Sequence, residues 1–510
     1  MFKIKVTALL LAAIASVSCC QASTYYVDAV GGNDASAGTT VATAWKTLQK
    51  ASTAQLMPGD KLLFRAGDTF AGHLAVEATG TPQARIVIGR YGHGADPELA
   101  GGGINNTVKL TNCSYLTLEN VAISNLGQTR EPRRMGVSLL ASDGTTCHDL
   151  VLRNLHIHDV NGSLVKSAGG GAGIDWNCTG TVHSRFDGLT IRGCLLERCD
   201  RNGIVGGGYT SRSNWYPSLH VVIRNNTLID TGGDGIVPIA CDGCIVEYNV
   251  VRDSGLHLPL KEYAAGIWPW GCDNTIVQYN EVSGQHGITG DAQGFDADWD
   301  CRNTIIQYNY SHDNEGGFLL VCDDGGSAPS FNAGNVGPII RYNLSVDDGY
   351  RPGNFSPTIH IAGPCSGTRI YNNTIIIGPK PVGSNDISFL RSNSWGGYAT
   401  DTLFQNNIIY SSGSVAYHLS KSVNTRFDNN LYYGKQIGLP HDPRALFADP
   451  QFVGPIAIAE GRGFADPFQL KAKSPAAHAG VIVTDNGGHD LVNTPLPMSG
   501  VSIGALQVRH

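Results

Sequence analysis

The chain has 510 residues, of which 42% are hydrophobic and 15% are charged, and its formal net charge is -7 at pH 7. This acidic balance lacks the basic footprint of a nucleic-acid-binding protein, so we expect no nucleic-acid partner. Glycine accounts for 64 residues, which is typical of a chain with many tight turns.

The first 22 residues have the pattern of a secretory signal peptide. Lys3 and Lys5 precede an apolar run over 6–17, and Ala22 ends a cleavage site of small residues. The run is too short for a membrane anchor, and no other stretch reaches a transmembrane length. We therefore predict a secreted or periplasmic protein; Cys19 or Cys20 leaves open an outer-surface lipoprotein.

Residues 23–60 predict an N-terminal cap. A strand and a loop rich in Gly, Asn and Asp precede a short amphipathic helix, expected from about 44 to 54. Trp45 and Leu48 are spaced to pack on the structure that follows, as a capping element must.

A short repeat fills the middle of the chain. Copies such as CSYLTLENV at 113, CDNTIVQYN at 272 and CRNTIIQYN at 301 share a polar turn, three mostly aliphatic residues and an Asn. Eleven copies start between 113 and 422, about 31 residues apart on average. Short β-rich runs with no room for a helix predict one coil of a parallel β-helix per repeat, with the Asn side chains stacked from coil to coil.

The fold prediction is thus an all-β solenoid of about eleven or more coils over 61–433. From 434 to 510 the period fades into loops rich in Pro, Gly and Asp, which indicates an irregular C-terminal cap. We expect 23–510 to form a single domain.

Several cysteines occur one coil apart in this repeat. Equivalent positions on stacked coils lie ~4.8 Å apart, within reach of a disulfide in an oxidising compartment. A column of free, buried thiols is the alternative, and it is the one we favour.

A second strand in most repeats opens with Gly and a large apolar residue, as in GIWPW at 266, GFDAD at 294 and GFLLV at 317. Alternation along a strand then identifies the side chains that leave the core. The residues expected to point outward are Asp175, Val237, Ile239, Trp268, Trp270, Asp296, Asp298, Asp300, Leu319, Val321, Asp323 and His360.

Tryptophans beside carboxylates predict a carbohydrate site, because an indole ring stacks on a sugar while carboxyl groups act on the glycosidic bond. We predict Asp296, Asp298 and Asp323 as catalytic residues. Expected substrate contacts are Trp268, Trp270, Asp175, His360, Lys261 in a long loop, and His286. His286 and Asp291 share the loop that enters the acidic strand, where both are candidates to flank the cleft and an ordinary turn is the alternative.

Calcium is the alternative for the acidic strand. Asp296, Asp298 and Asp300 alternate and could supply oxygen ligands. No cofactor is required by the favoured interpretation, and calcium remains a possibility.

The chain resembles the pectin-lyase-like superfamily of right-handed parallel β-helices, exported carbohydrate-active proteins. The resemblance rests on the YYVDAVGGND start, the TIIQYNYSHDN segments and the LKAKSPAAHAG close. It implies a right-handed helix acting on a polysaccharide or oligosaccharide. No single family is assigned, because the D-D pair at Asp323 and Asp324 and the GHG at 92–94 do not reproduce the polygalacturonase set.

Charge separates the possible reactions. From Asp230 to Asp324 there are sixteen Asp or Glu residues and three Lys or Arg residues, and an acidic face repels a polyanionic uronate. We therefore predict a glycoside hydrolase, with a calcium-assisted polysaccharide lyase second and a non-catalytic glycan-binding β-helix third. Oligomeric state is not predicted.

Overall fold

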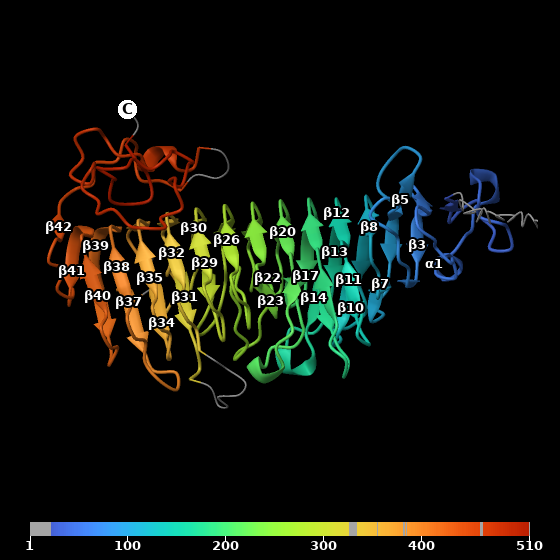
Figure 1. Ribbon diagram of the computed structural model, residues 1–510, viewed down its shortest axis with the longest axis horizontal. Helices are drawn as coiled ribbons and strands as arrows, with labels where there is room; N and C mark the ends of the chain where they lie inside the picture. The colour runs from blue at the N-terminus through green and yellow to red at the C-terminus, as the bar shows by residue number, and fades with distance from the viewer. Residues whose placement is uncertain are drawn as a thin grey trace, which may run out of the picture.

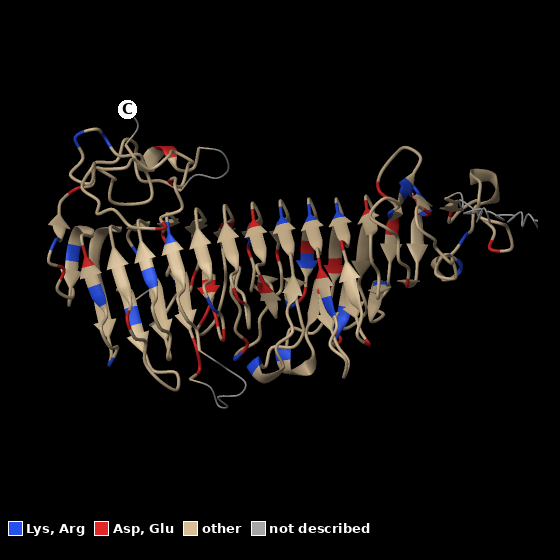
Figure 2. Ribbon diagram, in the orientation of Figure 1, with Lys and Arg blue, Asp and Glu red and all other residues tan. Residues whose placement is uncertain are grey.

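The computed structural model describes residues 22–325, 334–353, 355–380, 383, 385–458 and 463–508. The predicted signal peptide falls, apart from Ala22, outside this range. The described chain forms an elongated stack of parallel strands with short turns (Figure 1). Most of the strand length carries no charge (Figure 2), in keeping with the composition.

One long sheet runs the length of the stack and contains fourteen parallel strands. Its members, in spatial order, are β1 Thr24–Val27, β2 Lys61–Arg65, β5 Ile86–Tyr91, β8 Leu116–Glu119, β12 Val151–Arg153, β16 Thr190–Arg192, β20 Val222–Arg224, β24 Ile245–Glu247, β26 Ile276–Gln278, β29 Ile305–Gln307, β32 Ile339–Arg341, β35 Arg369–Tyr371, β38 Leu403–Gln405 and β40 Arg426–Asp428.

A second sheet follows it around each coil. Its strands are β3 Thr69–Ala71, β6 Glu98–Ala100, β9 Ala122–Asn125, β13 His156–Val160, β17 Leu195–Cys199, β21 Thr227–Ile229, β25 Val250–Arg252, β27 Glu281–Ser283, β30 Tyr310–His312, β33 Leu344–Val346, β36 Thr374–Ile377, β39 Ile408–Leu419, β41 Leu431–Ile437 and β42 Leu446–Phe447.

The third face carries the site. It comprises β4 Leu74–Val76, β7 Asn106–Thr111, β10 Arg134–Ala141, β14 Gly171–Cys178, β18 Asn202–Val205, β22 Asp234–Val237, β28 Gln293–Ala297, β31 Gly317–Cys322, β34 Ile359–Ala362 and β37 Ser388–Asn393. Isolated bridges at Ile267 join β22 to β28. A short corner sheet adds β11 Thr146–His148, β15 Arg185–Asp187, β19 Ser218–Leu219 and β23 Cys241–Asp242.

The predicted asparagine stack is present and confirmed. The Asn226 side chain donates to Asn249, and Asn249 donates to Asn280, over 2.9 and 3.0 Å. The same link continues through Asn309, Asn343, Asn373, Asn407 and Asn430. Each buried amide is thereby satisfied by its equivalent on the next coil, which fixes the register of the stack.

The cysteines from Cys113 to Cys365 are free and buried. The favoured prediction of an unbridged thiol column therefore holds, and the disulfide alternative does not. Their thiols pack as small apolar groups and donate to nearby carbonyls, as Cys301 does to Pro269 O over 3.4 Å.

At the N-terminal end, the expected helix is shorter than predicted. A 3₁₀ turn, η1 Val41–Thr43, is followed by α1 Leu48–Ala51. Trp45 and Leu48 are buried in the main core, as the sequence indicated.

At the other end, β41 crosses the predicted boundary at 434 and pairs with β39. Loops and the 3₁₀ turn η4 Asp466–Phe468 follow, and they lie along one edge of the last coils (Figure 1). Two further 3₁₀ turns, η2 Lys166–Ala168 and η3 Arg212–Asn214, interrupt the coils. No helix in the described residues is long and apolar enough to cross a membrane.

Candidate active site

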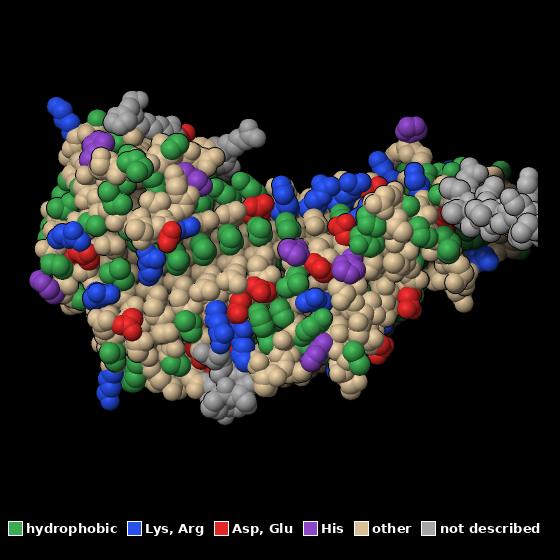
Figure 3. Space-filling view, in the orientation of Figure 1, with side chains coloured by type: hydrophobic (Ala, Val, Ile, Leu, Met, Phe, Trp, Pro, Cys, Tyr) green, Lys and Arg blue, Asp and Glu red, His purple; other side chains and the backbone are tan. Residues whose placement is uncertain are grey.

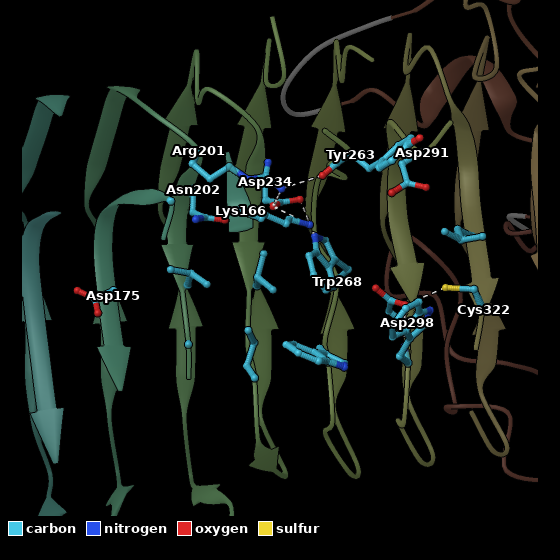
Figure 4. A pocket seen from close by; sticks show the side chains of 18 of the residues that line it. Lys166, Asp175, Arg201, Asn202, Asp234, Tyr263, Trp268, Asp291, Asp298 and Cys322 are labelled. Atoms are coloured by element: carbon cyan, nitrogen blue, oxygen red, sulfur yellow. Dashed lines mark hydrogen bonds and ion pairs between the residues drawn. The ribbon is translucent and has the colours of Figure 1, made fainter. Parts of the chain in front are cut away.

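A cavity of about 840 Å³ opens on the outer surface of the third face. Its wall is built from the strands around β14, β22 and β28 and from loops that approach them (Figure 4). In the space-filling view, hydrophobic side chains with acidic and basic neighbours gather over these middle coils (Figure 3). Its polar and aromatic lining residues are Lys166, Asp175, Trp176, Asn177, Arg201, Asn202, Asp234, Tyr263, Trp268, Trp270, Asp291, Asp298, Trp299, Phe355, His360 and Trp395.

Strand register selects which residues enter the wall. Ile236 pairs with Ile267, and Ile267 pairs with Phe295, all with their side chains in the core. The next residue in each strand therefore faces outward, as predicted for Trp268 and Asp296.

The prediction for β31 was wrong by one residue. Gly317 pairs with Gln293 and Leu319 pairs with Phe295, so Leu319 and Val321 face the core. Leu320 and Cys322 face outward instead, and both line the cavity. The repeated Gly-plus-apolar motif suggested the wrong alignment.

Asp298 is the predicted acid that the structure places in the cavity. Its Oδ1 accepts hydrogen bonds from the backbone N–H of Trp299 over 2.7 Å and from the thiol of Cys322 over 2.8 Å. Burial, assisted by the nearby Asp291, raises the pKa of Asp298 to about 7, although the hydrogen bonds from Cys322 and Trp299 act in the opposite direction. A carboxyl group with such a pKa keeps its proton near neutrality and can release it to a substrate.

Asp291, in the loop before β28, is a second carboxyl group in the same wall (Figure 4). Burial raises the pKa of Asp291 to about 6, while the cations of Lys166, Arg351 and Arg201 act in the opposite direction. Asp291 and the following Ala292 have φ angles of 41° and 66°. Two consecutive non-glycine residues in the left-handed region are strained, which is characteristic of functional positions.

Asp296 lies beside Trp268 in the outward column but is buried and does not line the cavity. Burial raises its pKa well above the usual range, and the neighbouring Asp298, Asp291 and Asp234 add to this effect. Its Oδ1 has no hydrogen-bond partner among the described residues. Asp296 is therefore a buried neighbour of the cavity carboxyl groups, and its surroundings favour its neutral form.

Asp234 organises the middle of the wall. Its Oδ1 accepts from the indole N–H of Trp268 over 2.9 Å and from the backbone of Ala265 over 3.0 Å. Its Oδ2 lies 3.1 Å from the buried guanidinium of Arg201 and 3.7 Å from Nζ of Lys166. The Lys166 ammonium also lies 4.9 Å from the Trp268 ring centroid.

The far end of the cavity is aromatic. His360 stands edge-on to Phe355 and Trp395, with ring centroids 5.1 and 5.5 Å apart. Its Nε2 donates to the side-chain oxygen of Asn393 over 2.7 Å. Burial lowers the pKa of His360 to about 4, so the ring is neutral and extends the apolar surface.

Asp175 lines the opposite end, on β14 (Figure 4). Burial raises its pKa to about 7. The predicted contacts Trp268, Trp270, Asp175 and His360 thus all line one cavity with Asp298, while their roles stay predictions.

Other predicted residues lie elsewhere. Asp323 accepts from the backbone N–H groups of Asp300 and Gly325 and does not line the cavity. His286 forms an ion pair with Glu315 over 3.2 Å and lines a separate, smaller pocket of about 340 Å³.

Lys261 is likewise outside the cavity wall, to which its loop contributes Tyr263 instead. The predicted calcium ligands do not converge. Asp300 forms an ion pair with Arg212 over 2.9 Å, and no group of three or more His, Cys, Asp or Glu side chains in the described ranges is arranged to hold a metal ion.

The sequence did not identify Lys166, Arg201, Trp299, Cys322 or Trp395 as site residues. Arg201 was detectable, because NGIV at 202 matches DGIV at 234 and marks a strand of the same face. Trp299 and Trp395 follow strand ends, where alternation gives no direction.

Comparisons with known proteins relate this chain to β-helix proteins and glycoside hydrolases. A model of the right-handed β-helix region matches residues 172–375. A lacto-N-biosidase of Bifidobacterium longum subsp. longum is 29% identical over 90% of this chain, and the chain spans about a third of that protein (33%). A crystal structure of the GH136 lacto-N-biosidase of Eubacterium ramulus is 26% identical, with a TM-score of 0.59, over 82% of this chain and 68% of that one.

The complex of XylC with xylose has a TM-score of 0.53 at 12% identity, over 95% of this chain and 98% of that one, and it bears on the fold alone. The predicted right-handed parallel β-helix is confirmed as the fold of this chain.

Proposed function

We propose that this chain is a glycoside hydrolase in which Asp291 and Asp298 are the catalytic pair. The observation that carries the proposal is that both carboxyl groups line one cavity and both have pKa values raised by burial, to about 6 and about 7. Glycosidic cleavage uses such a pair, one member protonated and the other ionised. Asp291 replaces the predicted Asp296 and Asp323, which do not reach the cavity.

The surroundings of each carboxyl group indicate which of the two donates a proton and which acts on the anomeric carbon. Lys166, Arg201 and Arg351 favour the ionised form of Asp291, whereas Asp298 has the higher pKa. Asp298 would donate its proton to the glycosidic oxygen as the bond from that oxygen to the anomeric carbon breaks. Asp291 would act on the anomeric carbon, directly or through a water molecule that it deprotonates.

Aromatic side chains on both sides of Asp298 would bind the two sugars on either side of the glycosidic bond and so orient the substrate. Trp268 and Trp270 form a platform next to the polar groups of Asp234, which suits the sugar that receives the nucleophile. Trp299 and Trp395 lie on the side of the proton donor, and so would face the leaving group.

The cations in the cavity argue against the lyase alternative. Elimination from a uronate needs a positive group free to neutralise the substrate carboxylate. Lys166 and Arg201 are instead held by Asp234 in ion pairs of 3.7 and 3.1 Å. The wall therefore suits a neutral sugar better than a uronate.

The substrate class follows from cavity size and from the relatives. A volume of about 840 Å³ lies in the upper part of the range for ligand sites, enough for the end of an oligosaccharide. Because the chain is similar to lacto-N-biosidases, a lacto-N-bioside is the first substrate to test. We also propose that the protein is exported, as the basic and apolar start of the sequence suggests.

The test is a panel of oligosaccharides and aryl glycosides, including a lacto-N-bioside, with product analysis. On the active substrate, Asp291→Asn and Asp298→Asn should each lower kcat/KM by roughly 10²–10⁴-fold. Asp323→Asn is the matched control, because its carboxyl group lies outside the cavity. Unsaturated, ultraviolet-absorbing products, or full activity in both cavity variants, would refute the proposal.

A further inference from the structure

Asp298 has an unusual partner for a carboxyl group in an enzyme cavity. The thiol of Cys322, on the next coil, donates a hydrogen bond to its Oδ1 over 2.8 Å (Figure 4). The column thiols Cys113 and Cys365 donate instead to backbone carbonyls, Cys113 to Val76 and Cys365 to Ala362. Cys322 is thus distinguished by its acceptor and by its place in the cavity wall.

The surroundings of this thiol keep it in the S–H form. Leu320, Ala362, Trp299 and Trp395 pack around it in one apolar cluster. Burial, together with the charge of Asp298, raises the pKa of the Cys322 thiol well above its usual range. A protonated thiol can donate its hydrogen but cannot compete with Asp298 as a base.

Both donors to Asp298 act on the same oxygen. The Trp299 N–H and the Cys322 S–H each bind Oδ1. Two donors on one oxygen restrict rotation of the carboxyl group, and we expect the proton to be exchanged at the other oxygen, Oδ2. The Cys322 hydrogen bond lowers the pKa of Asp298 more than the Trp299 bond does, and so offsets part of the rise caused by burial. A hydroxyl in place of the thiol is a stronger donor and would lower that pKa further.

We infer that Cys322 is a positioning residue for the acid Asp298, whose carboxyl group its thiol holds in one orientation. The inference rests on the proposed function of Asp298. Cys322 itself does not react with substrate in this scheme.

The test uses a graded pair of substitutions. Cys322→Ala removes the donor, so the pKa of Asp298 should rise and the basic limb of the kcat/KM profile should move up by about half a pH unit. Cys322→Ser supplies a stronger donor, so that limb should move down. The titratable groups facing Asp298 are Lys166, Asp291, Asp296, Cys301, Cys322 and Cys365.

Cys365→Ala is the matched control, because it empties a buried thiol position one coil further without removing a hydrogen bond to the acid. The basic limb of the kcat/KM profile should move less in Cys365→Ala than in Cys322→Ala. Coincident profiles for the Cys322 variants and wild type, or limbs in the reverse order, would overturn the inference.

A second measurement does not depend on activity. In Asp298→Asn the negative charge beside the thiol is gone, so Cys322 should react faster with iodoacetamide at pH 9, as followed by peptide mass spectrometry. Cys113, far along the stack, serves as the internal reference. An unchanged Cys322 rate would refute the contact itself, whereas a faster rate in a protein without glycosidase activity would refute only the proposed function.

Discussion

The indole N–H of Trp268 donates a 2.9 Å hydrogen bond to Oδ1 of Asp234, whose other oxygen lies 3.1 Å from the buried guanidinium of Arg201. The aromatic platform is therefore anchored by an ion pair and cannot turn freely. An anchored ring loses less conformational freedom when a sugar stacks on it.

Trp268→Phe keeps an aromatic ring but removes this anchor. We expect KM to rise about three- to tenfold with little change in kcat, since one hydrogen bond to a charged group is lost. Trp270→Phe is the matched control, as that ring shares the cavity wall without a bond to Asp234. Equal effects of both variants in steady-state kinetics would contradict the anchoring role.

The fold was readable from the sequence because its signal is periodic. The recurring aliphatic triplets set the core, and Asn226 to Asn430 set the register. The outward direction of Trp268 followed from alternation alone. Alternation failed at Gly317, where pairing with Gln293 shifted the frame by one residue.

The site was only partly predictable, since loops do not follow strand alternation. Asp291 enters the wall from a loop with positive φ angles, and Lys166 comes from the distant turn η2. Contacts between loops separated by more than a hundred residues leave no periodic trace in one sequence. Asp323 was misread because its carboxylate serves a local turn.

Arg351 offers a test of how Asp291 is held. Its guanidinium donates to the carbonyl of Gly290 over 2.7 Å, to that of Asp291, and to that of Phe355 over 2.8 Å. Arg351→Lys retains the charge but cannot reach all three carbonyls. We expect kcat to fall roughly 10–100-fold, because Asp291 would be misplaced.

Arg341→Lys is the appropriate control for that variant. Arg341 is also buried, and it binds Gln307 and Tyr371, outside the cavity wall. It should lower the melting temperature without a comparable loss of kcat. If both substitutions reduced kcat equally, the effect would be one of general stability.

Removal of divalent cations should leave activity unchanged. Asp300 is paired with Arg212, and Asp298 accepts from Trp299 and Cys322, so the acidic strand lacks a converging set of oxygen ligands. Initial rates before and after dialysis against EDTA, with added Ca²⁺ as the return step, measure this. A loss of activity that Ca²⁺ restores would reinstate the calcium alternative.

Asp296→Asn should stabilise the protein increasingly as pH rises. The pKa of Asp296 is raised in the folded state, so the native protein keeps a proton that the unfolded chain loses above about pH 4. The wild-type protein therefore loses stability as the pH rises from about 4 toward the raised pKa of the folded state, whereas an Asn at this position does not titrate and avoids that loss. The melting temperature of the variant should exceed that of wild type by a few degrees at pH 8 and match it near pH 4.

Asp159→Asn should have the opposite effect on stability. The hydrogen bond from Arg198 lowers the pKa of Asp159 to about 2, so its stabilising contribution is present above pH 4 and is lost as pH falls. This variant should melt below wild type at pH 8. A rise for both variants would point to a general effect of removing negative charge.

The pH dependence of catalysis tests the two assigned roles together. The reaction requires Asp291 ionised and Asp298 protonated, with pKa values of about 6 and about 7. The kcat/KM profile should therefore be bell-shaped, rising through about pH 6 and falling through about pH 7. Since the two carboxyl groups interact, the two apparent pKa values of the profile belong to the pair and not to either residue alone. The charged groups facing Asp291 are Lys166, Arg201, Asp234, Asp296, Asp298 and Arg351.

The pH profiles of the residual activity in Asp298→Asn and Asp291→Asn then show which carboxyl group produces which limb. Asp298→Asn should lose the basic limb on an aryl glycoside, whose leaving group needs little protonation, while the acid limb remains. Asp291→Asn should lose the acid limb. If Asp298→Asn removed the acid limb instead, the roles of the two carboxyl groups would be exchanged.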